Sequence, residues 1–341
     1  MRIVQRSVAV AAAASFILAA SATASSYSVE TTPDLLTVRM SRDTTLTDLP
    51  LLVADYNGFF AEQGVELENF SISASEAVQA LLAGELDIAE TTYHTMLVFY
   101  AEQGVEGPSD IIGLGETIVR PPYALMVADD VESIEDLEGR TVGISSPLDA
   151  GGVVVRDLLS EAGVDIDTVD FVPAGRSPDR LAALQSGAID AAILVPPLNF
   201  IAQDAGVTEL GWVPDMKGPD WVTSYFSFVA SRAWAEENRE AVVRFLQGVN
   251  QGLEWLHDPA NRDETIQLIV DLDIADAQMA EMAYDTLVAG DPSTFVDEVT
   301  VNEQGFAENV RELESLDEVS GALPTPEDFL DPSFVEEASA S

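Results

Sequence analysis

An internal repeat constrains the fold of this 341-residue chain more than any other feature of its sequence. Two segments carry the same order of patterns, and each closes on the motif Gly-x-x-Asp. Gly84 and Asp87 in the first segment lie 103 positions before Gly187 and Asp190 in the second. Because such self-similarity marks one structural unit used twice, we predict a chain of two related halves.

Each repeat has the pattern strand, helix, strand, helix, strand. The first begins at Thr37–Met40 and closes at Leu82–Ala89, and the second begins at Thr141–Ile144 and closes at Gln185–Ala192. Strands that alternate with helices require a parallel sheet covered by helices. We therefore predict an α/β protein of two lobes, each a mainly parallel sheet flanked by helices.

Helical patterns dominate after the second repeat. Tyr225–Ala230 is predicted to be a strand, and Arg239–His257 carries apolar residues at helical spacing, as a helix packed on a sheet would. Further helices are predicted at Glu264–Asp271, Ala275–Leu287 and Asn302–Ser315. Pro324–Ser341 reads as a loose end with a disordered tip.

The N-terminus has the order of features typical of a secretory signal peptide. Arg2 and Arg6 precede the apolar run Ser7–Ala20, and small residues follow at Ala22-Thr23-Ala24, which predicts a signal peptide over residues 1–24. The apolar run is too short to span a bilayer as a helix. The chain has no cysteine, which excludes disulfides, a lipid-modified cysteine and thiolate metal sites. We therefore expect a soluble periplasmic protein with no lipid anchor.

The charge balance is strongly acidic, with 60 acidic against 15 basic residues and a net charge of −45. Lys217 is the single lysine. A surface of this charge repels nucleic acid and anionic lipid, so neither is an expected partner. Mutual repulsion among the carboxylates destabilises the fold unless salt screens it, because the screening length falls from about 10 Å at 0.1 M to about 3 Å at 1 M. The composition therefore predicts a halophilic, acidic surface.

Several stretches resemble a known family. They are Asp55–Leu67, the closure Gly84-x-x-Asp87, Ile134–Ile144 and Ala188–Ala191, in this order along the chain. Together they resemble the substrate-binding proteins of ABC importers for nitrate, sulfonates and thiamine precursors, the SsuA/THI5-like (NMT1) family. The resemblance implies the type II periplasmic-binding fold.

By that resemblance, the first lobe is discontinuous and spans residues 36–124 and 225–341, and the second spans 125–224. Two chain crossings, near Tyr123–Val127 and Thr223–Ser227, would form the hinge. The ligand would lie between the lobes at the carboxyl ends of the strands, and the closed form would dock to an inner-membrane permease. The expected state is a monomer.

Four loops are expected to face the cleft, at 41–47, 71–76, 91–95 and 145–152. In the last loop, Ser145, Ser146 and Asp149 precede Ala150-Gly151-Gly152 at a predicted helix start, where free N–H groups and the helix dipole favour an anion. The Asp149 carboxylate has two interpretations. It either contacts the ligand or caps its own helix and fills the anion site itself.

Basic and aromatic residues on predicted loops are further candidates. Arg42, Arg120 and Arg176 carry guanidinium groups that suit a carboxylate or sulfonate, or else form surface ion pairs. Trp221, Tyr225 and Tyr93 would form a stacking box for a planar ligand if they are not core residues. His94 is a candidate hydrogen-bond donor in the cleft, with core packing as the alternative. The full set of candidate ligand contacts is Ser41, Arg42, Thr44, Ser73, Thr92, Tyr93, His94, Arg120, Ser145, Ser146, Asp149, Gly151, Arg176, Asn199, Trp221 and Tyr225.

Three functions fit these features. The leading hypothesis is the solute-binding component of an ABC importer, with no cofactor, that binds a small organic anion such as a sulfonate, a carboxylate or a nitrate-like solute. The second ligand class is a neutral or cationic heterocycle, such as a pyrimidine precursor of thiamine, because the field of the protein favours cations. The alternative of another class is an enzyme on the same fold, a pyrimidine-phosphate synthase or an aromatic-acid decarboxylase. The sequence lacks cysteine and a Gly-x-Ser-x-Gly motif, which disfavours an enzyme.

Overall fold

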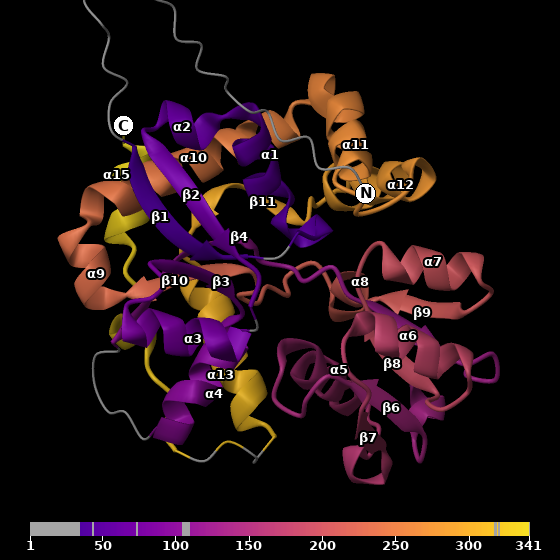
Figure 1. Ribbon diagram of the computed structural model, residues 1–341. Helices are drawn as coiled ribbons and strands as arrows, with labels where there is room; N and C mark the ends of the chain where they lie inside the picture. The colour runs from indigo at the N-terminus through magenta and orange to yellow at the C-terminus, as the bar shows by residue number, and fades with distance from the viewer. Residues whose placement is uncertain are drawn as a thin grey trace, which may run out of the picture. The chain divides into compact units, whose positions relative to one another are not determined.

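Two mixed β-sheets, each with its own helices, organise the chain (Figure 1). The computed structural model describes residues 35–42, 44–72, 74–103, 110–316, 319 and 321–340. The predicted signal peptide, residues 1–24, and Ser73 lie outside these ranges. In the described part of the chain, no helix combines the length and the apolar character needed to cross a membrane.

The six-stranded sheet has the strand order β11-β4-β10-β3-β1-β2. Its strands are β1 (Leu36–Ser41), β2 (Val65–Phe70), β3 (Ile88–Thr91), β4 (Ile111–Ile118), β10 (Ser227–Ser231) and β11 (Phe295–Thr300). The helices of this lobe are α1 (Leu49–Asn57), α2 (Phe59–Glu62), α3 (Ala74–Ala83), α4 (Tyr93–Gln103), α9 (Arg232–Glu237), α10 (Arg239–His257), α11 (Arg262–Asp271), α12 (Ala277–Leu287), α13 (Glu303–Glu314), α14 (Pro326–Phe329) and α15 (Ser333–Ser339). Two 3-10 turns, η1 (Leu46–Asp48) and η4 (Pro259–Asn261), join them.

The five-stranded sheet has the strand order β7-β6-β8-β5-β9. Its strands are β5 (Ala124–Val127), β6 (Thr141–Ile144), β7 (Asp170–Pro173), β8 (Ala191–Leu194) and β9 (Thr208–Trp212). Its helices are α5 (Ala150–Glu161), α6 (Ser177–Gln185), α7 (Leu198–Asp204) and α8 (Val213–Lys217), with 3-10 turns η2 (Ile134–Leu137) and η3 (Ile166–Thr168). The predicted α/β fold of two lobes is therefore confirmed.

The reversed strands of each sheet follow from how the chain enters it. β1, β2 and β3 pair in parallel, as do β6, β7 and β8, whereas β10 and β5 pair antiparallel with their neighbours. A strand that enters a lobe from the crossing starts at the end of the sheet where the parallel strands finish. It must therefore run the opposite way. β10 and β5 are the strands that follow the two crossings.

The crossings are residues 119–123, between β4 and β5, and residues 218–226, between α8 and β10. The first lies a few residues earlier than predicted, because Ala124–Val127 is the strand β5. The second crossing is hydrogen-bonded to the first and to the end of β4: Thr223 N donates to Val119 O at 3.0 Å, and Tyr225 N donates to Ile118 O at 3.3 Å. This pairing holds the two chain segments side by side, and their action as a hinge stays a prediction. The proposed lobe boundaries near residues 124 and 225 stay a prediction.

The Gly-x-x-Asp closures of the repeat have a structural role. Asp87 Oδ2 accepts from the backbone N–H of Arg39 at 2.8 Å, and Asp190 Oδ2 accepts from the backbone N–H of Thr141 at 2.9 Å. The guanidinium of Arg39 donates to the Asp87 carboxylate as well. In both lobes the aspartate at the start of the third strand therefore fixes the first strand beside it. Neither aspartate lies in the candidate site described below.

The C-terminal segment differs from its prediction. Residues 326–339 hold two short helices, α14 and α15, and Phe329 and Phe334 are fully buried. Phe329 contacts the rings of Tyr93, Tyr100 and Phe306 at centroid distances of 5.1 to 6.1 Å. The prediction of a loose end was wrong because four-residue and seven-residue helices that bury one ring each leave no periodic pattern.

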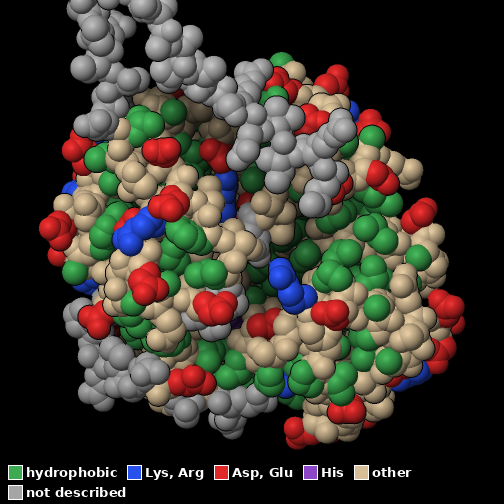
Figure 2. All heavy atoms as spheres, in the orientation of Figure 1, with side chains coloured by type: hydrophobic (Ala, Val, Ile, Leu, Met, Phe, Trp, Pro, Cys, Tyr) green, Lys and Arg blue, Asp and Glu red, His purple; other side chains and the backbone are tan. Residues whose placement is uncertain are grey.

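Acidic side chains are spread over the visible face of the molecule and do not gather in one patch (Figure 2). Most of the described arginines form an ion pair with an acidic side chain. For example, Arg262 Nη2 lies 3.0 Å from Asp285, and Arg39 Nη2 lies 2.5 Å from Asp87. The halophilic character of this surface stays a prediction from composition.

Candidate functional site

A cavity of about 260 Å³ lies where the two lobes meet the crossings, and we call it the cleft cavity. Its lining combines the carboxyl ends of β1 and β3, the start of α5, and both crossings. The lining residues are Ser41, Arg42, Ile72, Glu90, Thr91, Thr92, Thr95, Tyr123, Asp149, Ala150, Gly151, Tyr225 and Phe226. All four loops predicted to face the cleft contribute to this list. The crevice at the carboxyl ends of parallel strands is where ligands bind in open α/β sheets.

A second chamber of about 480 Å³ adjoins the first, and we call it the side chamber. The two share Tyr225 and Phe226, and the side chamber is also lined by Thr44, Arg176 and the segment 195–198. Of the predicted contacts, Ser41, Arg42, Thr92, Asp149, Gly151 and Tyr225 therefore line the cleft cavity, and Thr44 and Arg176 line the side chamber. Ligand-sized pockets range over about 300–1,000 Å³. The side chamber falls within this range and the cleft cavity lies just below it, so the cleft cavity alone suits only a small solute.

The crossings supply an aromatic wall. Tyr123 and Tyr225 meet edge to face with centroids 5.4 Å apart, and the Phe226 ring lies 4.8 Å from that of Tyr225. Burial raises the pKa of Tyr225 to about 12, and burial also raises the pKa of Tyr123 well above its usual range. Both phenols are therefore protonated at neutral pH. The wall offers apolar ring surface together with neutral hydroxyl groups that donate and accept hydrogen bonds.

Asp149 is the N-cap of α5. Its Oδ1 accepts from Gly152 N at 2.8 Å, so the capping interpretation of this residue is confirmed. The carboxylate occupies the place where free N–H groups would attract an anion. The predicted anion site at this helix start is therefore filled by the chain itself.

The three candidate arginines do not converge. Arg42 lines the cleft cavity and donates to Asp55 Oδ2 at 2.6 Å, while its Nη1 is buried without a hydrogen-bond partner in the described part of the chain. Arg120 donates to the carbonyls of Pro214, Gly218 and Pro219 at 2.7 to 3.2 Å, which ties the two crossings together. Of these three arginines, Arg42 lines the cleft cavity, whereas Arg176 lines the side chamber and Arg120 the flank of the crossings.

Glu90 brings an acceptor to the same cavity, and sequence reasoning missed it. It stands in the otherwise uncharged strand β3 and is 8% exposed. Asp48, which is fully buried, lies behind it: burial raises the pKa of Asp48, and hydrogen bonds with Glu90 and Thr45 lower it in part. A carboxyl pair in such an environment shares a proton, because two adjacent buried carboxylates repel each other. The signal available in the sequence was a lone charge inside an apolar strand.

Several other candidates lie outside the cleft cavity. Tyr93 is packed against Phe306 and Phe329 in the core, and Trp221 lies beside Lys217, whose Nζ is 5.8 Å from the indole. These two rings and Tyr225 therefore do not form the predicted stacking box. Ser145 Oγ accepts from Arg180 Nη1 at 2.6 Å, and Ser146 is exposed.

His94 is a core residue. It is 1% exposed, and its Nε2 lies 2.8 Å from Glu312 Oε2. Asn309 Nδ2 lies 3.1 Å from His94 Nδ1 and donates to Thr223 Oγ1 at 2.6 Å. His94 therefore links α4 to α13 and to the second crossing, and the packing alternative for this residue holds. The other histidine, His257, contacts the carbonyl of Val296 at 3.1 Å.

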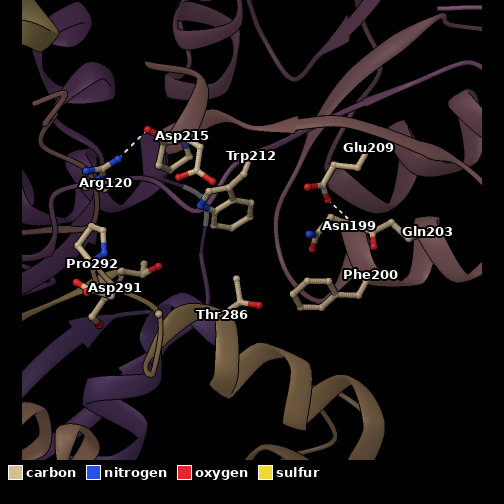
Figure 3. Close-up of a pocket in the computed structure, with 14 residues that line it drawn as sticks. Arg120, Asn199, Phe200, Gln203, Glu209, Trp212, Asp215, Thr286, Asp291 and Pro292 are labelled. Carbon is tan, nitrogen blue, oxygen red and sulfur yellow. Dashed lines mark hydrogen bonds between the residues drawn. The ribbon is translucent and has the colours of Figure 1, made fainter. Parts of the chain in front are cut away.

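Arg120 and Asn199 line a third cavity, of about 360 Å³, on the flank of the crossings (Figure 3). We call it the flank cavity. Phe200, Glu209, Trp212 and Asp215 come to it from the five-stranded lobe, and residues 290–294 come from the other lobe. It is separate from the cleft cavity, with which it shares no lining residue.

One carboxylate cluster has the dimensions of a metal site. Oxygens of Asp157, Glu308 and Glu312 lie within 4.8 Å of one another. Lys217 Nζ lies 2.6 Å from Asp157 Oδ2, and Arg311 Nη2 lies 2.8 Å from the same oxygen. Side-chain cations already balance this cluster, so it does not lead to a metal assignment.

Glu116, buried beneath the second crossing, gives a test of pH dependence. It is fully buried, it accepts from Ser224 Oγ at 3.1 Å, and burial raises its pKa well above the usual range. The folded state retains this proton at a pH where the unfolded state has lost it. The contribution of Glu116 to the free energy of unfolding therefore falls as pH rises above about 4.3. The loss is about 1.4 kcal/mol per pH unit until the folded pKa is reached.

We expect Glu116→Gln to remove this loss, because a glutamine amide replaces the protonated carboxyl without ionising. Urea unfolding at a series of pH values from 4 upward measures the free-energy difference between variant and wild type. The free energy of unfolding of the variant should increase relative to that of the wild type as pH rises. Glu68→Gln, at an exposed carboxylate of β2, is the control and should give a difference that is independent of pH. A pH-independent difference for Glu116→Gln would show that this carboxyl is ionised in the fold.

Comparison with known families gives one match that covers most of the chain. The model described as NMT1/THI5 like matches residues 47–262. This range includes both repeats except β1, both crossings and most of the cleft cavity lining.

Two relatives with assigned names were found. The putative binding protein YtlA of Bacillus subtilis is 22% identical over 239 residues, which cover 68% of this chain and 69% of YtlA. The formylaminopyrimidine-binding protein of Halalkalibacterium halodurans is 22% identical over 237 residues, 64% of this chain and 65% of the relative. Both are named as binding proteins.

Among solved structures, the periplasmic aliphatic sulphonate binding protein SsuA of Escherichia coli has a similar fold, with a TM-score of 0.71. The alignment covers 88% of this chain and 93% of SsuA at 18% identity. At this identity the likeness describes the fold, which is two-lobed in both proteins.

Proposed function

Because this chain belongs to the NMT1/THI5 like family, we propose that it is the solute-binding component of an ABC importer, which binds a small molecule in the cleft cavity and delivers it to a permease. The observation that carries the proposal is the composition of that cavity. Both lobes and both crossings contribute side chains to it. A ligand that contacts all of them favours the closed arrangement of the lobes, which a permease can distinguish from the open one.

The ligand class that fits best is a small planar heterocycle, neutral or cationic, with a hydrogen-bond donor next to an acceptor. Tyr123, Tyr225 and Phe226 provide the ring surface, Glu90 provides the acceptor, and Arg42 Nη1 provides the donor. An aminopyrimidine has this combination of groups. The formylaminopyrimidine-binding relative supports the same class, and the acidic field of the protein favours cationic over anionic solutes.

A small organic anion is the second candidate. The unpartnered Nη1 of Arg42 favours it, since a buried guanidinium nitrogen without an acceptor carries a free-energy cost that an anion would relieve. Two features oppose it: Asp149 fills the helix start, and Arg120 is directed to backbone carbonyls. An enzyme of the same fold is not favoured, because His94 lies in the core and the chain has no cysteine.

A thermal-shift screen in high salt tests the function and the ligand class together. The panel is 4-aminopyrimidine, thiamine, methanesulfonate, benzoate and nitrate. A ligand at 100 times its dissociation constant adds about 2.7 kcal/mol of stability, which moves the melting temperature measurably. We expect 4-aminopyrimidine or thiamine to stabilise the protein. Stabilisation by the anions alone would overturn the heterocycle class and leave the receptor function standing.

Glu90→Gln tests the site itself. We expect it to weaken binding of the stabilising heterocycle about 10- to 100-fold, because an amide at this position removes the negative charge that the Asp48–Glu90 pair shares, and a hydrogen bond to a charged group contributes about 1.5–3 kcal/mol. Glu85→Gln, at an exposed carboxylate just before β3, is the matched control and should leave affinity unchanged. Isothermal titration of the three proteins measures the effect. Equal affinity of wild type and Glu90→Gln would exclude the cleft cavity as the heterocycle site.

A further inference from the structure

The flank cavity has the features of a built site. Its volume, about 360 Å³, exceeds that of the cleft cavity, and its walls come from both lobes and from the first crossing. Helix α7 separates it from the side chamber: Leu198 and Ile201 line the side chamber, whereas Asn199, Phe200 and Gln203 line the flank cavity. The alternation follows from the helical period, which sends neighbouring residues to different faces.

Asn199 is an unusual wall residue. It is 1% exposed, and its side-chain Oδ1 is buried without a hydrogen-bond partner in the described part of the chain. A buried amide oxygen with no donor costs about 1–3 kcal/mol. A donor inside the flank cavity, from a ligand or an ordered water, would relieve that cost.

The charges around the cavity are predominantly negative. Glu209, Asp215 and Asp291 line it, against one cation, Arg120. Arg120 donates to the carbonyl of Pro214 at 2.7 Å and to those of two residues in the second crossing, so three of its five N–H donors are committed to backbone (Figure 3). Asp215 and Asp291 are exposed at the rim, and no ion pair is found for either in the described part of the chain.

Aromatic surface faces this acidic rim. Figure 3 shows the Trp212 indole and the Phe200 ring directed toward the space between α7 and residues 286–292. Trp212 is half-buried at the end of β9, and its indole lines the cavity. A cation over an indole face gains about 0.5–2 kcal/mol, more than over any other aromatic side chain.

We propose that the flank cavity binds a small organic cation, held by the Trp212 indole face and the carboxylates of Asp215 and Asp291. The site lies apart from the cleft cavity and does not depend on the proposed solute. An anion would meet three carboxylates there, against a single guanidinium that already donates to three backbone carbonyls. A neutral apolar molecule would leave Asn199 Oδ1 unpartnered, whereas a cation that carries N–H groups would supply its missing donor.

The tetramethylammonium ion is a suitable probe of the Trp212 and carboxylate part of the site, because it offers the charge and shape of an organic cation. It has no hydrogen-bond donor, so the contact with Asn199 Oδ1 does not enter the test. The chain has four tryptophans, and the indole N–H resonance of Trp212 is identified by its loss in Trp212→Phe. We expect titration of wild-type protein with tetramethylammonium chloride, at constant ionic strength set by sodium chloride, to move the Trp212 resonance saturably. Sodium methanesulfonate should not move it.

Two variants distinguish binding in the flank cavity from a general attraction of cations to the acidic protein. Asp291→Asn is expected to weaken binding of tetramethylammonium about threefold to tenfold, whereas Asp204→Asn, an exposed carboxylate at the end of α7 outside the cavity lining, should change it less than about twofold. A Trp212 resonance that fails to move, or that moves without saturation, would overturn the proposal. Equal weakening by both variants would overturn it too. Binding of the cleft ligand enters none of these readouts, so failure here is distinct from failure of the proposed function.

Discussion

Replacing Phe329 with alanine is expected to lower the free energy of unfolding by about 3–5 kcal/mol, the cost of deleting a buried aromatic ring. Phe329 is fully buried in the second core of the six-stranded lobe. Its ring centroid lies 5.1 Å from that of Tyr93 and 5.5 Å from that of Phe306. Leu330, the next residue, is bridged to Gly113 of β4. Helix α14 therefore cannot move into the space left by the ring without displacing β4.

Urea unfolding at fixed high salt, followed by far-ultraviolet circular dichroism, measures this loss. Phe70→Ala is the matched control, because Phe70 is 37% exposed at the end of β2, and its loss should cost under about 1 kcal/mol. A loss of that small size for Phe329→Ala would mean that residues 326–339 are not docked in solution, as the composition of this segment first indicated.

Asp157→Asn is expected to cost about 3 kcal/mol, the lower end of the range for breaking a buried ion pair. Asp157 lies on α5 of the five-stranded lobe, and Arg311 Nη2 of α13 in the other lobe donates to it at 2.8 Å. Lys217 Nζ lies 2.6 Å away, with a side chain that is only 2% exposed. Removing the carboxylate leaves that ammonium buried with Glu161 as its remaining partner. Arg311, which is half-exposed, keeps Glu308 and adds less to the loss.

The pH dependence of the same variant has a definite sign. Burial alone would raise the pKa of Asp157, but hydrogen bonds from Arg311 and Lys217 outweigh it and lower that pKa. A lowered carboxyl pKa contributes stability above about pH 4, and the contribution disappears as pH falls through the folded value. The gap between wild type and Asp157→Asn should therefore be largest near neutral pH and close in acid.

Asp130→Asn is the control for the Asp157 experiment. Asp130 pairs with Arg140 at 2.8 Å, but its side chain is 67% exposed, so the loss should stay under about 1 kcal/mol. A cost for Asp157→Asn as small as this would show that the Asp157–Lys217 pair is solvated in solution and not buried. Because this ion pair joins α5 to α13, the same variant should also change how readily the lobes open.

The architecture was predictable because it rests on local periodicity. The repeat predicted the order β, α, β, α, β in both lobes, and the helix Arg239–His257 was predicted with its observed bounds, since ten of its residues are buried at helical spacing. The first crossing lies a few residues earlier than predicted for a related reason. The strand β5 is too short, at four residues, to show where a connection ends and a strand begins.

The site was predicted at the level of loops, not of contacts. Every one of the four predicted loops lines the cleft cavity, because the carboxyl ends of parallel strands share one edge of a sheet. Which residues of these loops line the cavity and which are buried in the core could not be predicted from the sequence. Thr92 lines the cavity while its neighbours Tyr93 and His94 are turned into the core by the first turn of α4, and Glu90 lines it from within a buried strand.

By itself, the sequence determined what depends on short-range pattern: two repeats, their helices and strands, the acidic balance and the loops that end each strand. Tertiary structure alone decided how charges and rings from distant segments combine. It joined Asp48 to Glu90 and Tyr123 to Tyr225, tied Asp157 on α5 to Arg311 on α13, and buried Phe329 against Tyr93. Partners separated by 40 to more than 200 positions leave no local periodicity, so their pairing follows from the packing of whole elements, and that packing fixes which groups face the solute.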